Sequence, residues 1–519
     1  TYMKAQLDYG VKAALEREEE KEKRRKEQHQ NKPPKPLVAS IDELEKRQKT
    51  KHLPKIDLYP LQNEDEKYAN EELKPEINWN DENTVKNSKH LFEMLNQERK
   101  DCTPSALLSM GAGTGKTSSA VRTIGETQLR LGKKIPFIVI SKPRIIDGRG
   151  WQKTIKQWNV DNPDNQIQPV LIDTVDKFAN KLTDARVVKQ IVKELDIKNS
   201  IIICDEVHLY KTPTSKRSKK LHKLSFIKKL GLSATLITND AVFDIGSYLI
   251  LANFYNSKND FMNRTKLKPF ISRWGNAVYK KDGSIDKEKW PQYYNVMNQY
   301  SSILYQPDTS RIDKMMPDIN QTIVQLPYNE ELQSDMKSLG IALKNHVFEN
   351  HNDYYMEFVR RLHHDKQRLN KLIEIITQDN VKQPLIFYQN VMVKGFIEDA
   401  LKEAGYTDWQ EISGQSKSFG DFDHSNLNPV LAQYTSAAEG IELKNSNTTV
   451  FYQNQRRADI LTQVKGRNRR LGMKGVINHY HILADDVNDQ YIYDIAQQRK
   501  NVEEDVMKDA ILANLKQRG

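Results

Sequence analysis

The sequence predicts an α/β protein with two parallel-sheet lobes, a helical connector between them and a charged N-terminal arm. Three observations support this prediction. From about residue 79 onward, short apolar runs alternate with helix-forming segments, which is typical of parallel strands covered by helices on both faces. This alternation occurs twice, with a charged helical stretch between the two series. Ahead of the first series the chain is strongly charged and offers no apolar face for burial.

The composition agrees with this class. The chain has 519 residues, which is enough for two or three domains with hydrophobic cores of their own. Hydrophobic residues make up 38%, and no apolar run approaches the roughly 20 residues needed to span a bilayer. The first residues also lack the apolar segment of a signal peptide. We therefore expect a cytoplasmic protein without membrane association, in which Cys102 and Cys204 are reduced thiols.

The charge balance is basic. Lys and Arg total 80 against 69 Asp and Glu, which gives a net charge of +11. This balance suits a polyanionic partner such as a nucleic acid, but many basic proteins bind none. The prediction of a partner therefore depends on the motifs.

The arm covers residues 1–75. A run of Glu, Lys and Arg fills much of 12–35, and prolines at 33, 34 and 36 prevent a helix from continuing. Such a run forms either a solvating tail or a surface that recruits a protein partner. The sequence leaves both interpretations open.

The lobes follow the arm. We expect a first lobe over 76–265, a helical connector over 266–380, a second lobe over 381–495 and a C-terminal helix over 496–519. The strands are expected where the short apolar runs lie: 106–109, 136–140, 169–172, 201–204 and 230–233 in the first lobe, and 385–389, 430–434, 449–452 and 479–483 in the second.

A glycine-rich loop between the first predicted strand and the next helix carries the strongest signal. In this context backbone N–H groups and the helix dipole converge on one anion site. Lys116 would reach the β- and γ-phosphates of a nucleotide, and the Thr117 hydroxyl would bind Mg²⁺. The loop departs from the full G-x-x-x-x-G-K-[ST] pattern because Met110 replaces its first glycine. We expect nucleotide contacts from Gly111, Gly113, Thr114, Gly115, Lys116, Thr117 and Ser118.

Two carboxylates follow the apolar strand predicted at 201–204. Asp205 would lie at the strand tip beside the phosphate loop, where Mg²⁺ needs a second protein anchor. Glu206 is then placed to polarise the attacking water. His208, two residues further on, either bridges to a later motif or is an ordinary polar residue at a strand end.

A basic segment, Q-V-K-G-R-N-R-R at 463–470, lies in the second lobe. Arg467 and Arg470 are three residues apart and would share one face of a predicted helix. The planar guanidinium binds two phosphoryl oxygens at once and stays charged, so both residues are candidates for completing a nucleotide site. Alone, the segment would indicate a basic surface patch or a nucleic-acid contact.

Taken in order, these segments resemble the motif series of superfamily-two helicases, most closely that of the Swi/Snf-type double-stranded DNA translocases. The resemblance covers roughly residues 80–495. The matching segments are G-T-G-K-T at 113–117, D-E-V-H at 205–208, L-Y-K-T-P-T-S-K-R-S at 209–218, L-S-A-T-L-I-T-N at 232–239, D-I-G-S-Y-L-I-L-A-N-F-Y at 244–255, L-I-F-Y-Q at 385–389, T-S-A-A-E-G-I-E-L at 435–443 and Q-V-K-G-R-N-R-R at 463–470.

The resemblance implies two RecA-like lobes that bind ATP and Mg²⁺ between them. It adds Gln463 as a catalytic residue and Gly440 as a nucleotide contact. It also implies that Lys142, Gln389 and Thr435 grip the phosphodiester backbone of a nucleic acid.

Two segments depart from the family pattern. Glu442 stands where the family often has Asn, and no glutamine occupies the expected adenine-recognition segment at 85–95.

These features predict an ATP hydrolase that moves along nucleic acid, with duplex DNA favoured, in DNA replication, recombination or repair. An RNA helicase is the first alternative. The second is an ATP-gated DNA-binding recruitment factor that acts through the arm at 1–75. The compact length and the Lys- and Asn-rich composition favour a phage or bacterial source, and hence the cytoplasm of a bacterial or phage-infected host cell.

Overall fold

The computed structural model describes most of the chain after the arm. The described residues are 77–518 without 112, 148, 183–198, 223–227, 238–239, 268–270, 273–274, 277, 281–283, 311–313, 346, 349, 415–422, 424, 439–442, 444, 470–474 and 486. The predicted arm at 1–75 therefore lies outside the described residues. Residues Asp57–Gly519 form one compact unit of the chain.

The first lobe is built on a parallel sheet. In the described part of the chain this sheet has six strands in the order β3-β2-β4-β5-β1-β8. The strands are β1 (Ser105–Ser109), β2 (Phe137–Ser141), β3 (Pro169–Thr174), β4 (Ile201–Asp205), β5 (Lys228–Ser233) and β8 (Leu304–Tyr305). Every residue of β1, β2 and β4 is buried, which explains their continuous apolar runs.

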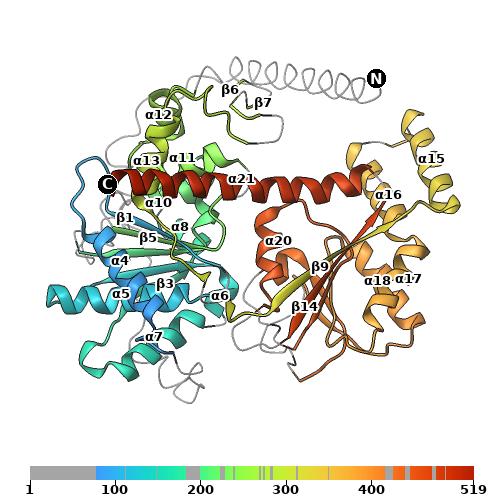
Figure 1. The fold of residues 1–519 in the computed structure, drawn as a ribbon, viewed down its shortest axis with the longest axis horizontal. Helices are drawn as coiled ribbons and strands as arrows, with labels where there is room; N and C mark the ends of the chain where they lie inside the picture. The colour runs from blue at the N-terminus through green and yellow to red at the C-terminus, as the bar shows by residue number, and fades with distance from the viewer. Residues whose placement is uncertain are drawn as a thin grey trace, which may run out of the picture. The chain divides into compact units, whose positions relative to one another are not determined.

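Helices pack around the first sheet and on one another (Figure 1). They are α4 (Glu82–Asn96), α5 (Lys116–Leu131), α6 (Pro143–Asp147), α7 (Gly150–Asp161), α8 (Val175–Lys181), α10 (Lys216–His222), α11 (Ala241–Leu251), α12 (Lys258–Arg264) and α13 (Tyr293–Ile303), with short 3₁₀ turns at η1 (Pro163–Asn165) and η2 (Val207–Tyr210). Glycine is required in α5 where α7 packs on it. A Cβ at Gly125 would lie 2.1 Å from the Trp158 ring, far inside van der Waals contact.

The second lobe is built on another parallel sheet, with the order β11-β12-β10-β13-β14-β9 among the described strands. The strands are β9 (Asp318–Leu326), β10 (Leu385–Tyr388), β11 (Gln410–Ile412), β12 (Val430–Gln433), β13 (Thr448–Phe451) and β14 (Val476–Ala484). The helices are α15 (Glu330–Lys344), α16 (His351–His363), α17 (Lys366–Ile376), α18 (Val391–Glu403), α19 (Tyr434–Ala437), α20 (Ala458–Lys465) and α21 (Val487–Arg518).

A buried ion pair ties the second lobe together. Arg368, at the start of α17, lies 2.8 Å from the Asp489 carboxylate and also donates to the backbone oxygens of Tyr452 and Ile482. The Arg368 and Asp489 side chains are 1% and 2% exposed. Because its partners are carboxylate and carbonyl oxygens, this buried guanidinium charge is both paired and hydrogen-bonded.

The predicted fold class is confirmed, and the two parallel sheets are consistent with two RecA-like lobes. Each strand expected from an apolar run is present within one to three residues of its predicted ends. The region 266–380, which we expected to form a helical connector, also supplies β8 to the first sheet and β9 to the second. It contains a two-stranded antiparallel pair as well, β6 (Ile271–Ser272) and β7 (Gly275–Asn276). The C-terminal helix α21 begins at Val487, before the predicted start at 496.

Among the described residues, no helix combines the length and the apolar composition that crossing a bilayer requires.

Candidate functional site

The phosphate loop leads from β1 into α5, as predicted. Gly113 and Gly115 have φ values of 77° and 93°, a left-handed conformation that glycine adopts without steric cost. Lys116, the first residue of α5, donates from Nζ to the backbone oxygens of Met110 and Gly111 at 3.0 and 2.9 Å. Thr114 closes the loop by donating to Gly111 O at 2.8 Å. The side chains of Thr117 and Ser118 are partly exposed on the first turn of α5.

Met110 has a packing role that accounts for the departure from the usual loop. Its side chain is only 3% exposed and belongs to the core of the first lobe. Asn87, on α4, donates to the Met110 thioether at 3.6 Å and to Ser119 Oγ at 3.3 Å. Tyr305, on β8, donates in turn to Asn87 Oδ1 at 2.9 Å. Met110 therefore anchors the loop to α4, whereas a glycine at this position would give the backbone more conformational freedom.

Asp205 lies at the carboxyl end of β4, as predicted, and its carboxylate is held by two distant residues. Its Oδ2 accepts from Ser141 Oγ at 2.9 Å and from Trp151 Nε1 at 3.0 Å. Burial and the neighbouring Glu206 charge raise the pKa of Asp205, against the effect of these two hydrogen bonds. Sequence reasoning did not find Ser141 or Trp151, because their contacts depend on the tertiary fold. Ser141 ends β2, which is the neighbour of β4 in the sheet, and Trp151 lies in α7.

Glu206 adopts an unusual backbone conformation directly after Asp205. Its φ of 54° and ψ of 53° are left-handed, which costs a non-glycine residue about 1–3 kcal/mol and is typical of functional sites. Its Oε2 lies 3.1 Å from His208 Nδ1. Burial alone would raise the pKa of Glu206, but His208, Lys142 and Lys116 together hold it well below its ordinary value. The side chain is therefore a carboxylate that can orient water but is a weak base.

His208 connects Glu206 to the next strand. Its Nδ1 also lies 3.0 Å from Ser233 Oγ, at the end of β5. His208 is 3% exposed. Of the two interpretations that the sequence left open for this residue, the structure supports the bridge to a later motif.

Lys142 belongs to the same cluster. It follows β2, is 9% exposed, and its charge contributes to lowering the pKa of Glu206. Lys116 acts on the pKa values of both Asp205 and Glu206. The carboxyl edge of the first sheet thus brings two lysines and two carboxylates together. Lys142 thus lies close enough to Glu206 for its charge to lower the pKa of that carboxylate, and its contact with a nucleic-acid backbone stays a prediction.

The basic segment of the second lobe differs from the predicted helix. Helix α20 ends at Lys465 with Gly466 as its C-cap, so Arg467 lies beyond the helix. Arg467 is 7% exposed, and its Nη2 donates to Ala438 O at 2.7 Å. Gln463 is 3% exposed within α20. Two other residues predicted for this site, Arg470 and Gly440, lie outside the described residues.

Two predicted backbone contacts lie side by side at the edge of the second sheet. Gln389 follows β10, and Thr435 lies in α19 directly after β12. These two strands pair in parallel with Tyr388 opposite Gln433. Both Gln389 and Thr435 are exposed, so their side chains are accessible to a partner.

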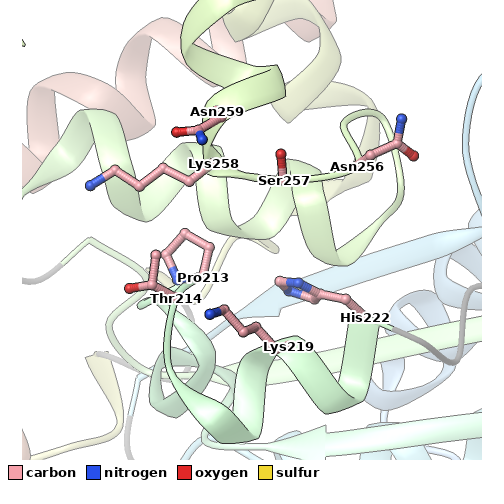
Figure 2. A pocket seen from close by; sticks show the side chains of 8 residues that line it. All are labelled: Pro213, Thr214, Lys219, His222, Asn256, Ser257, Lys258 and Asn259. Carbon is pink, nitrogen blue, oxygen red and sulfur yellow. The ribbon is translucent and has the colours of Figure 1, made fainter. Parts of the chain in front are cut away.

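A separate pocket of about 400 Å³ lies between α10 and the start of α12. Figure 2 shows Lys219 and His222 on α10 beneath the segment 256–259. Burial and, to a smaller extent, the charge of Lys229 lower the pKa of His222 to about 4, so its imidazole is neutral at pH 7. The lining residues are Pro213, Thr214, Lys219, His222, Asn256, Ser257, Lys258 and Asn259. This pocket shares no lining residue with the phosphate loop or the carboxylate pair.

The residues present fit a divalent cation. Hydroxyl and carboxylate oxygens, the groups expected from Thr117 and Asp205, are what Mg²⁺ prefers, and this ion usually keeps several waters instead of a full protein cage. A cation beside Asp205 would also compensate the burial of its charge.

Comparisons with known proteins add an independent observation. No family model matches the chain. A curated relative, the chromatin-remodeling ATPase INO80 of Debaryomyces hansenii, is 24% identical over 222 residues, which cover 39% of this chain. The chain is similar to a Swi/Snf-type ATPase. This similarity agrees with the family that its motifs resemble. The match spans only 16% of the length of that relative.

Among solved structures, the Sulfolobus solfataricus SWI2/SNF2 ATPase core in complex with dsDNA is similar to this chain with a TM-score of 0.33 and 16% identity. The match covers 83% of this chain and 94% of that one.

Proposed function

We propose that the protein is an ATP-driven motor of the Swi/Snf type that moves along duplex DNA. The observation that supports this most directly is the cluster of Lys116, Asp205 and Glu206 at the carboxyl edge of the first sheet. A phosphate loop, a buried strand-end carboxylate and a water-orienting carboxylate are the parts that ATP hydrolysis requires. The order of motifs along the chain and the similarity to the curated relative support the same assignment.

In this proposal each group acts on ATP in a defined way. The loop from Gly111 to Ser118 surrounds the phosphates with backbone N–H groups, and the Lys116 ammonium balances the charge of the β- and γ-phosphates. Thr117 and Asp205 would hold Mg²⁺, which neutralises phosphate charge when bound. Glu206, kept ionised and oriented by His208, positions the attacking water. Lys142 adds a second positive charge to this cluster.

The second lobe completes the site in the proposed closed form. Arg467 and Arg470 would stabilise the phosphoryl charge that develops in the transition state, because a guanidinium fork binds two oxygens at once. Gln463, from the same segment 463–470, and Gly440, from the segment 435–443, would also contribute. Closure of the lobes then assembles the catalytic groups, and hydrolysis releases them.

Arg467→Ala should lower kcat by about 10²-fold or more, since charge stabilisation in the transition state is lost. The structure adds a second effect. Loss of the donor to Ala438 O should reduce the free energy of unfolding by about 1–3 kcal/mol. Steady-state ATPase assays and thermal unfolding measure the two effects separately. Arg360→Ala, which removes an exposed arginine of α16, is the control. An unchanged kcat for Arg467→Ala would remove it from the catalytic role.

We propose that Gln389 and Thr435 contact the phosphodiester backbone from the exposed edge of the second sheet. Contacts to phosphates carry no base sequence, so binding should be sequence-tolerant and should weaken as salt rises. ATPase rates with duplex DNA, single-stranded DNA and RNA test the choice of partner. Stimulation by RNA that exceeds stimulation by duplex DNA would favour the RNA helicase alternative.

Translocation without strand separation is the expected action on duplex DNA. The motifs at 209–218 and 232–255 resemble the Swi/Snf-type proteins more than the strand-separating relatives. A third strand paired in the major groove should therefore be displaced when ATP is present, because a motor tracking the backbone clears that groove. Under the same conditions a blunt duplex should stay paired. Efficient separation of the blunt duplex contradicts the proposal.

A further inference from the structure

Helix α21 belongs to both lobes by its contacts. It begins three residues after β14 of the second sheet, packs against α20 of that lobe, and also packs against α11 and α13 of the first lobe. Figure 1 shows this helix in red, running from the second sheet to the helices of the first lobe. Near its end Asp509 accepts a hydrogen bond from Tyr293 and lies 2.7 Å from Lys287 Nζ.

One carboxylate of α21 holds the backbone that follows β5. Glu503 Oε1 accepts from Leu236 N at 3.1 Å, and the carboxylate also receives a hydrogen bond from Ile237 N. The Leu236 carbonyl is fixed from the other side, since Tyr248 Oη donates to it at 2.7 Å. A side chain 267 residues away along the sequence thus determines where this segment lies.

The same short segment reaches the catalytic carboxylate at its other end. Ser233 Oγ binds Thr235 through both its N–H and its carbonyl, at 3.2 and 2.8 Å. Ser233 Oγ is also 3.0 Å from His208 Nδ1, which lies 3.1 Å from Glu206 Oε2. Residues 233–237 are therefore held by His208 at one end and by Glu503 at the other.

We propose that Glu503 is a positioning residue for ATP hydrolysis, which couples the docking of α21 to the orientation of Glu206 through residues 233–237 and His208. This inference rests on the proposed function, because it takes Glu206 as the group that orients water. The C-terminal part of α21 has two states in this proposal, docked on the first lobe or released from it. The docked state fixes the position of Ser233, the partner of His208. Such a chain of contacts transmits a change only if Glu503 at one end and His208 at the other both affect the position of residues 233–237.

The surroundings of Glu503 give the coupling a dependence on pH. Burial, with the charges of Asp459 on α20 and Asp244 on α11, raises the pKa of Glu503 to about 8. Tyr248 and Tyr300 also face it from α11 and α13. A released Glu503 would titrate near its ordinary value of 4.5. The docked state is therefore favoured most below pH 4.5, and this preference is lost as the pH rises toward 8.

Substitution of Glu503 tests the coupling in the full-length chain with duplex DNA and saturating ATP. Glu503→Ala should lower kcat about tenfold, while KM for ATP changes less than about twofold, because the nucleotide contacts remain. Glu504→Ala is the matched control. Glu504 is the next residue of the same helix, is exposed, and lies 3.5 Å from Lys500. Its removal deletes the same side chain from the same helix, with the same change of helix propensity, without touching residues 233–237.

Glu503→Gln separates positioning from folding. The amide keeps an acceptor for Leu236 N but cannot ionise, so its kcat should match wild type near pH 6 and exceed it several-fold near pH 8.5. If the wild-type protein hydrolyses ATP and Glu503→Ala has the same kcat as Glu504→Ala, the coupling is overturned. If Glu503→Ala does not fold, parallel pH profiles of wild type and Glu503→Gln overturn it instead. A wild-type protein without ATPase activity contradicts the proposed function itself.

Discussion

Lys116→Ala should reduce ATP turnover to below about a tenth of the wild-type rate, and the loss should exceed that of the other loop substitutions. The substitution removes the ammonium that the proposed mechanism places on the β- and γ-phosphates, a contact of the kind that supplies several kcal/mol of transition-state stabilisation. In the structure this ammonium donates to two backbone oxygens of the loop, Met110 O and Gly111 O. Steady-state phosphate release with saturating duplex DNA measures the effect.

The control for this prediction is Lys133→Ala. Lys133 is an exposed lysine just after the C-cap of α5, so its removal changes the net charge by the same amount at a distance from the loop. It should leave turnover within about twofold of wild type. Lys116→Ala also loses two hydrogen bonds to backbone oxygens, which should lower the free energy of unfolding by about 1–3 kcal/mol, so thermal unfolding must show that the variant is folded at the assay temperature. Turnover above a tenth of the wild-type rate would exclude the assigned role.

The sequence predicted the site best where local structure alone creates it. A strand, a glycine turn and a helix start are neighbours in the chain, so the positions of Lys116 and Thr117 follow from one short segment. Asp205 and Glu206 likewise follow a strand whose burial its apolar run predicts. The placement of residues that depends on a single segment can therefore be predicted before the fold is known.

Contacts between segments could not be predicted in the same way. Trp151 and Ser141 are 54 and 64 residues from Asp205, and only the packing of α7, β2 and β4 in the fold brings them together. Glu503 meets Leu236 because α21 continues onto the first lobe, which no motif indicates. A signal for α21 existed, since a charged helical pattern extends to the end of the chain, but it does not reveal which surface the helix contacts.

Weak periodicity explains the strands that were missed. In the outer strand β9, six of the nine positions are exposed and two more are only partly buried, so it lacks the apolar run that marked the inner strands. β8 has two residues, too few for any periodic pattern. Arg467 was predicted on a helix because helix-forming residues precede it, but Gly466 ends α20 and places Arg467 on the following turn.

Glu206→Gln should separate ATP binding from hydrolysis. The glutamine has the same shape and can occupy the same left-handed position, so the loop and Asp205 keep their contacts with nucleotide. It lacks the negative charge that polarises water, and loss of such a group usually costs 10²- to 10⁴-fold in kcat. Nucleotide affinity, measured by fluorescence titration, should stay within about threefold of wild type. Lost binding would contradict the water-orienting role.

The electrostatic environment of Glu206 adds a dependence on pH to this prediction. His208, Lys142 and Lys116 hold its pKa well below the ordinary value of 4.5, against the effect of burial. A group whose pKa is lowered keeps its charge as the pH falls and loses it only below that lowered pKa. Protonation of Glu206 should therefore not reduce the wild-type rate between pH 8 and pH 5. His208→Ala removes the largest of the lowering influences, so an acid limb should appear in its kcat profile at higher pH than in wild type. Superimposable profiles of His208→Ala and wild type would show that His208 does not maintain the Glu206 charge. The control is Glu98→Gln, at an exposed position, which should reproduce the wild-type profile.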